Sequence, residues 1–136
     1  MSEEMQMPRS TGSLNDPEPA PTGIGVPVWP LVISDLHLAL LGGGSQRRDS
    51  RTDLIISLMI DDMSERDLMG RAKYGTALMT NNGRSALRDA YQEALDLAVY
   101  LRQAVREGDE GVQPAYRDAL SMVTMLRTMI HVRFGK

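Results

Sequence analysis

The sequence contains no cysteine and little aromatic surface, and both shortages limit what the chain can be. Without cysteine, disulfides and thiolate metal sites are excluded. Aromatic residues make up only 4% of the chain, so a core must be built from Leu, Ile, Val, Ala and ten methionines. That mixture favours helices over sheets. The only two histidines, His37 and His131, lie far apart and lack the spacing of metal ligands.

Strong net charge and long apolar runs are also missing. A net charge of -3 predicts no general affinity for nucleic acid or for an anionic membrane. No apolar run approaches 18 residues and no secretory h-region is visible, which predicts a soluble cytosolic protein with no membrane partner. A length of 136 residues is enough for one domain core but not for two.

The chain divides by composition into an arm and a helical domain. Residues 1–27 hold five of the seven prolines together with Gly, Ser and acidic residues, which predicts a flexible N-terminal arm. Residues 28–136 show no strand pattern and predict an all-α bundle of three long helices plus a short first one. The expected helices are a short one within 26–41 and long ones at about 52–73, 85–107 and 113–132, with Thr52 or Asp53, and then Ser85, as N-caps.

Acidic residues interrupt the apolar pattern of the second predicted helix. Leu54, Leu58 and Leu68 recur at helical spacing, and Asp61 and Glu65 fall on the same stripe. We interpret this stripe as core-facing, where unpaired carboxylates are costly unless something compensates them. A bound divalent metal is the expected compensation. The alternative for any one acidic pair is a solvated helix face.

The full acidic pattern resembles a known family. It consists of Asp61-Asp62-x-x-Glu65, 27 intervening residues and Glu93-x-x-Asp96. This pattern is similar to the E-E-x-x-E and E-x-x-D motifs of the MazG-like all-α nucleoside triphosphate pyrophosphohydrolases, with aspartate at both leading positions. Residues 73–76 (KYGT), 82–84 (NGR) and 89–102 look closer still to the MazZ-type branch of phage dATP/dGTP diphosphohydrolases. The likeness covers about residues 53–105.

The resemblance implies a reaction, a cofactor and an assembly. It implies hydrolysis of a purine deoxynucleoside triphosphate, dGTP or dATP, to the monophosphate and pyrophosphate, in a phage that remodels its host's nucleotide pool in the host cytoplasm. Two or more Mg²⁺ or Mn²⁺ ions would be held by the carboxylates, and the chain would form a homodimer or homotetramer. The expected metal ligands are Asp61, Asp62, Glu65, Glu93 and Asp96. Among these, Glu65, Glu93 and Asp96 are the catalytic candidates, with Glu65 accepting the proton of the attacking water.

Four further residues are candidates for binding substrate. Lys73 and Arg84 flank the loop between the two acidic helices and could reach phosphate oxygens, although solvated loop charges are an equal alternative. Asn81 could hydrogen-bond a base edge. Trp29 could stack on a base, or it could anchor the arm to the core.

Two other functions compete with hydrolysis. A non-catalytic helical oligomer, such as a phage adaptor protein, would carry the same acidic residues on a solvated surface. Methionines at helical spacing on the second and fourth predicted helices indicate an adaptable core or a subunit interface, and the apolar faces of the long helices favour a homo-oligomer. A di-iron bundle enzyme ranks lower, because such proteins use Glu-x-x-His pairs and none occurs here.

Overall fold

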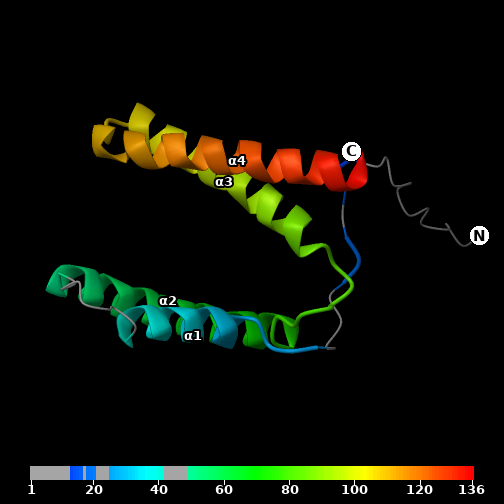
Figure 1. Ribbon diagram of the computed structural model, residues 1–136, viewed down its shortest axis with the longest axis horizontal. Helices are drawn as coiled ribbons and strands as arrows, with labels where there is room; N and C mark the ends of the chain where they lie inside the picture. Colours follow the sequence, from blue (N-terminus) through cyan, green and yellow to red (C-terminus); the bar gives the residue numbers. More distant parts are fainter. Residues whose placement is uncertain (1–12, 17, 21–24, 42–48) are drawn as a thin grey trace, which may run out of the picture. The chain divides into compact units, whose positions relative to one another are not determined.

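The computed structural model describes residues 13–16, 18–20, 25–41 and 49–136, and most of these residues lie in helices (Figure 1). The three long helices and the short first one confirm the predicted all-α class. No strand occurs in the described ranges, where Pro27 and Met79 form an isolated β-bridge. None of the described helices has the length and apolar character that crossing a membrane requires. The elements are α1 (Trp29–Leu41), α2 (Ser50–Tyr74), α3 (Ala86–Arg106), the short 3₁₀ helix η1 (Glu110–Val112) and α4 (Gln113–Phe134).

The helices belong to two compact units, each described by itself. One unit spans Pro19–Arg84, and in it α1 packs along α2. The other combines Met1–Glu18 with Ser85–Lys136, and in it α3 and α4 form a hairpin closed by η1 (Figure 1). In the predicted arm, residues 1–12, 17 and 21–24 lie outside the described residues, whereas Ser13–Asp16 and Glu18 contact α3.

Helix ends follow local capping chemistry, with one correction to the predicted starts. Asp49 caps α2 by accepting a hydrogen bond from the backbone N–H of Arg51, so neither Thr52 nor Asp53 is the cap. The prediction was wrong because all three residue types are good caps and the sequence does not choose among them. Ser85 caps α3 as predicted, accepting from the N–H of Arg88 at 3.2 Å. Gly75 ends α2 in the left-handed conformation.

The face of α2 that packs within its unit is not the predicted one. Its half-buried positions recur at helical spacing and are Asp53, Ile56, Ile60, Met63, Asp67 and Gly70. The stripe containing Leu54, Leu58, Asp61, Glu65 and Leu68 is exposed, with Leu68 68% accessible. Apolar residues occupy two faces of α2, and α1, with 13 residues, covers only one of them. The interpretation of this stripe as core-facing within the chain is therefore corrected.

The α3–α4 hairpin carries the most buried side chains. Ala94 and Ala98 of α3 and Ala119 and Ile130 of α4 are all buried, with Ile130 only 2% exposed. Small side chains let the two helices approach closely, so the pair is tightly packed along this seam. The apolar positions of α3 that recur at helical spacing face this seam, since each is buried or half-buried; they are Leu87, Tyr91, Ala94, Ala98, Leu101 and Val105. On α4, Leu120 is 43% exposed and its neighbour Ala119 takes the buried position.

The loop between α2 and α3 is tied to the segment that precedes α1. The N–H of Val28 donates to the carbonyl of Leu78, and the N–H of Thr80 donates to the carbonyl of Val26, each at 2.8 Å. The turn that follows is built on Asn82, whose buried side chain accepts from the N–H of Arg84 at 3.1 Å. These contacts hold the start of α1 beside the loop within the same unit.

Candidate functional site

The first acidic group lies on α2. Asp61, Asp62 and Glu65 occupy consecutive turns of an unbroken helix, and all three side chains are exposed. None of them makes a hydrogen bond or ion pair with another residue that the structure describes. Asp61 and Glu65 are four residues apart, a spacing that brings two side chains within about 6 Å on a helix. Three negative charges therefore lie within two turns of α2 and have no hydrogen-bond or ion-pair partner among the described residues.

The second acidic group lies on α3. Glu93 and Asp96 are exposed, and Tyr100, 67% exposed, continues their ridge one turn later. The buried residues Ala94 and Ala98 mark the side of α3 that packs on α4, so the acidic ridge lies on the other side. Within the described residues neither Glu93 nor Asp96 has a hydrogen-bond or ion-pair partner. Asp89, earlier on the ridge, is half-buried and does have an interaction partner.

A neighbouring aspartate on α2 shows what a compensated carboxylate looks like in this chain. Asp67 pairs with Arg71 one turn later, with 2.9 Å between Oδ1 and Nε. The hydrogen bond to Asp67, helped by its charge, raises the pKa of the Arg71 guanidinium further above its ordinary value. Such i,i+4 pairs stabilise an isolated helix. The five carboxylates of the two acidic groups have no comparable structural role.

The donor chemistry of these residues fits a hard divalent cation. Exposed carboxylate oxygens are the ligands that Mg²⁺ and Mn²⁺ prefer, and both ions keep bound water when protein ligands are few. The α2 group and the α3 group belong to different units. Across the described chain, no three Asp, Glu or His side chains are grouped closely enough to hold one ion together. Each unit thus presents its own set of potential ligands.

The remaining predicted site residues have varied surroundings. Lys73 is exposed at the end of α2, with its Nζ 5.1 Å from the centre of the Tyr74 ring. Arg84 is half-buried and donates to the carbonyl of Pro19 at 3.3 Å, so its guanidinium is already engaged. Asn81 is exposed with a φ of 52°, which gives it a backbone role in the turn. Trp29 is half-buried as the first residue of α1.

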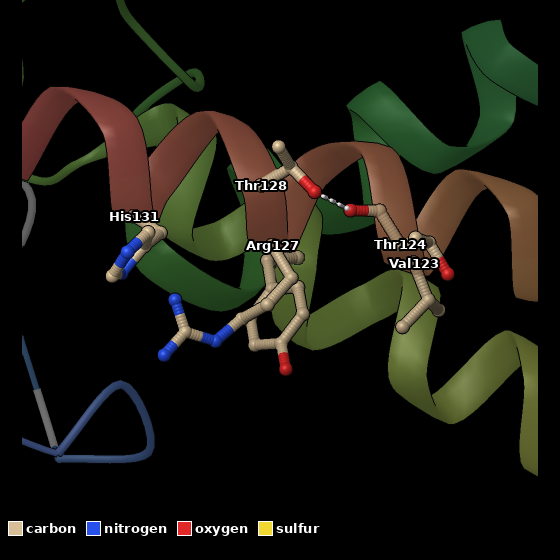
Figure 2. Close-up of a pocket in the computed structure, with 6 residues that line it drawn as sticks. Val123, Thr124, Arg127, Thr128 and His131 are labelled. Carbon is tan, nitrogen blue, oxygen red and sulfur yellow. Dashed lines mark hydrogen bonds between the residues drawn. The ribbon is translucent and has the colours of Figure 1, made fainter.

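A groove between α3 and α4 was not anticipated from the sequence. It has a volume of about 510 Å³ and is lined by Tyr91 from α3 and by Val123, Thr124, Arg127, Thr128 and His131 from α4 (Figure 2). Arg127 donates to the carbonyl of Lys136 at 2.6 Å, and the hydroxyls of Thr124 and Thr128 donate to carbonyls of their own helix. In the sequence, this groove is indicated only by Arg127 and His131, which are four residues apart on one helix face together with threonines.

No protein-family model matches the chain, and no curated protein or solved structure matches it. A function for the chain is therefore inferred from its own residues. The features from which it is inferred are the two exposed acidic groups, one on α2 and one on α3.

Proposed function

We propose that the chain is a metal-dependent nucleoside triphosphate pyrophosphohydrolase that converts dGTP or dATP to the monophosphate and pyrophosphate. The observation that carries this proposal is the state of five carboxylates in the motif spacing, all exposed and all without a described partner. Like charges one turn apart destabilise a helix by a few tenths of a kcal/mol per pair. A cation that binds them would offset this repulsion, so metal binding would stabilise the helix.

The residues suggest a division of roles. Asp61, Asp62, Glu93 and Asp96 would hold two or more Mg²⁺ or Mn²⁺ ions, and Glu65 would share in this. Bound ions would supply charge neutralisation for the triphosphate and a water of lowered pKa. Glu65 would accept the proton of the water that attacks the α-phosphorus. The bond between that phosphorus and the oxygen bridging to the β-phosphate then breaks, and pyrophosphate leaves in line with the attack.

Cationic and aromatic residues support the substrate in this proposal. Lys73, exposed beside the loop that follows α2, would contact phosphate oxygens, and Arg84 would do the same once it leaves the carbonyl of Pro19. Asn81 and Trp29 are the candidates for contacts with the base. The preference for purine deoxynucleotides, and a setting in a phage-infected host cytoplasm, follow from the motif resemblance.

Exposed apolar side chains support a homodimer or homotetramer. The exposed large apolar residues of α2 are Leu54, Ile55, Leu58, Met59, Leu68 and Met69. These residues form apolar patches at both ends of the exposed side of α2, and exposed apolar patches often mark protein interfaces. The same observation favours the second candidate function, a non-catalytic helical oligomer that acts as a phage adaptor.

Product analysis separates the two functions. Each of the eight common ribonucleoside and deoxyribonucleoside triphosphates is incubated with the protein in Mg²⁺ or Mn²⁺, and the products are resolved by anion-exchange chromatography. The proposal predicts monophosphate and pyrophosphate from dGTP or dATP, and none after chelation of the metal. Release of inorganic phosphate would place the cleavage at a different bond. Absence of turnover, together with no rise in melting temperature on adding metal, would favour the adaptor.

A further inference from the structure

One arginine of α3 binds three main-chain carbonyls of the described part of the arm. The guanidinium of Arg88 donates from Nε to the carbonyl of Leu14 at 2.9 Å and from Nη2 to the carbonyl of Ser13 at 2.9 Å. The same Nη2 also donates to the carbonyl of Asp16. Three main-chain oxygens of one short segment therefore converge on one side chain. The planar fork of donors on arginine suits such convergence, whereas the ammonium of lysine does not.

Two further contacts fix the same segment on the same helix. The amide of Gln92, one turn after Arg88, donates to the carbonyl of Leu14 at 2.7 Å. The carboxylate of Glu18 accepts from the N–H of Ser85 at 2.7 Å, at the point where α3 begins. A negative charge at a helix N-terminus is stabilised by the helix dipole. The arm is thus held at both ends of a contact that covers the first two turns of α3.

The position of this contact relates it to the acidic ridge. Arg88 precedes Glu93 by five residues, which is about 7.5 Å along a helix axis. Gln92 lies directly before Glu93 and four residues before Asp96, on the same run of turns. A ligand that carries several phosphates and approaches the ridge would therefore come within reach of Arg88. That guanidinium can bind the ligand only after its hydrogen bonds to the arm break.

We propose that residues 13–16, together with Glu18, form a releasable strap, and that a polyphosphate ligand displaces the strap by taking the guanidinium of Arg88. Phosphate oxygens are stronger acceptors for the arginine guanidinium than neutral carbonyl oxygens are, because both partners then carry charge and the contact can be bidentate. The exchange of three carbonyl acceptors for phosphate acceptors is therefore favourable for Arg88. The choice of a polyphosphate rests on the proposed function, whereas the docking of the strap does not.

The absence of cysteine makes the strap easy to label. Asn15 is exposed within the strap, so Asn15→Cys gives one attachment point for a nitroxide in the full-length chain. The mobility of the label is read by electron paramagnetic resonance, with a chelator present and inorganic tripolyphosphate as the probe. Arg88→Ala and Arg88→Lys are the test variants. Arg102→Ala, which removes an exposed arginine from the same helix, is the matched control, and circular dichroism checks that every variant keeps its helices.

If the strap is docked on α3, the label should be immobilised in the parent and in Arg102→Ala. Both Arg88 variants should free the label, with the ratio of docked to released strap falling roughly 10- to 100-fold, the size expected for hydrogen bonds to a charged group. Tripolyphosphate should free the label saturably in the parent and add nothing in Arg88→Ala. A label that is mobile in the unliganded parent, or still immobilised in Arg88→Ala, would overturn the strap. If tripolyphosphate leaves the mobility of the label unchanged in the parent, displacement of the strap by a polyphosphate is ruled out. This result is independent of hydrolysis, because no turnover is needed.

Discussion

Gly25 lies against Thr80 so closely that no side chain fits between them. A Cβ on Gly25 would fall 2.6 Å from the hydroxyl oxygen of Thr80 and closer still to its carbonyl oxygen. Gly25 also has a φ of 113°, a conformation that other residues rarely adopt. This contact stands beside the hydrogen bonds that join Val26 to Thr80, so it marks the point where the segment before α1 meets the loop after α2.

Replacement of Gly25 by alanine should lower the free energy of unfolding by about 1–3 kcal/mol, because the new methyl group meets main-chain atoms and the backbone is strained. Gly70 provides the matched control, since it lies inside α2 and a Cβ there would meet nothing within 4 Å. Gly70→Ala should raise the free energy of unfolding by about 0.5–1 kcal/mol. Urea denaturation followed by circular dichroism measures both. Equal effects of the two substitutions would contradict the close approach of Gly25 and Thr80.

Removal of the cap of α2 should destabilise the chain by about 1 kcal/mol. Asp49→Ala deletes the carboxylate that accepts from the N–H of Arg51 at 3.1 Å. Thr52→Ala, at the position suggested by the sequence, should change the free energy of unfolding by less than about 0.5 kcal/mol, because exposed substitutions inside a helix have small effects. Urea denaturation compares the two. A larger loss of unfolding free energy from Thr52→Ala than from Asp49→Ala would mean that α2 begins at Thr52.

The seam between α3 and α4 should dominate the stability of its unit. Ile130→Ala removes the most buried apolar side chain named in the core and should cost about 2–5 kcal/mol. Val132→Ala, two residues later and 76% exposed, should cost less than about 0.5 kcal/mol. Thermal unfolding of both variants tests the contrast. Similar melting temperatures would mean that α4 presents a different face to α3.

Local signals in the sequence predicted most of the helical fold. Ser85 was recognisable as the cap of α3, because a cap acts on backbone groups only a few residues away. The packed side of α3 follows an equally local rule, since Ala94 and Ala98 repeat at helical spacing on one face. These interactions need no knowledge of the rest of the fold.

Features that depend on distant residues were harder to predict. The sequence of α2 has apolar residues on two faces, and only the position of α1 decides which face is covered. The clamp of Arg88 on Ser13, Leu14 and Asp16 joins residues more than 70 positions apart through main-chain oxygens, which carry no sequence signal. The motif spacing singles out the five carboxylates as candidates, and their lack of described partners required the structure.

The exposed stripe of α2 should mediate association of the chain. Leu54→Glu combined with Leu58→Glu places two charges on a face where the parent residues are 58% and 47% exposed. If a second copy covers this face, analytical ultracentrifugation should show a dimer or tetramer for the parent and a smaller species for the double variant. Ser57→Glu, exposed on the same helix, is the control for added charge. A monomeric parent at micromolar concentration would contradict the proposed homo-oligomer.

The most direct test of the proposed chemistry is the effect of Glu93→Gln on turnover of dGTP and dATP in Mg²⁺ or Mn²⁺. This change keeps the size of the side chain and removes a charge that has no described partner in the fold. Glu110→Gln, an exposed glutamate outside both acidic groups, is the matched control. The account predicts that Glu93→Gln abolishes formation of monophosphate and pyrophosphate while Glu110→Gln leaves it unchanged, with both variants folded. Equal turnover by the parent and Glu93→Gln, or no turnover by the parent, would contradict it.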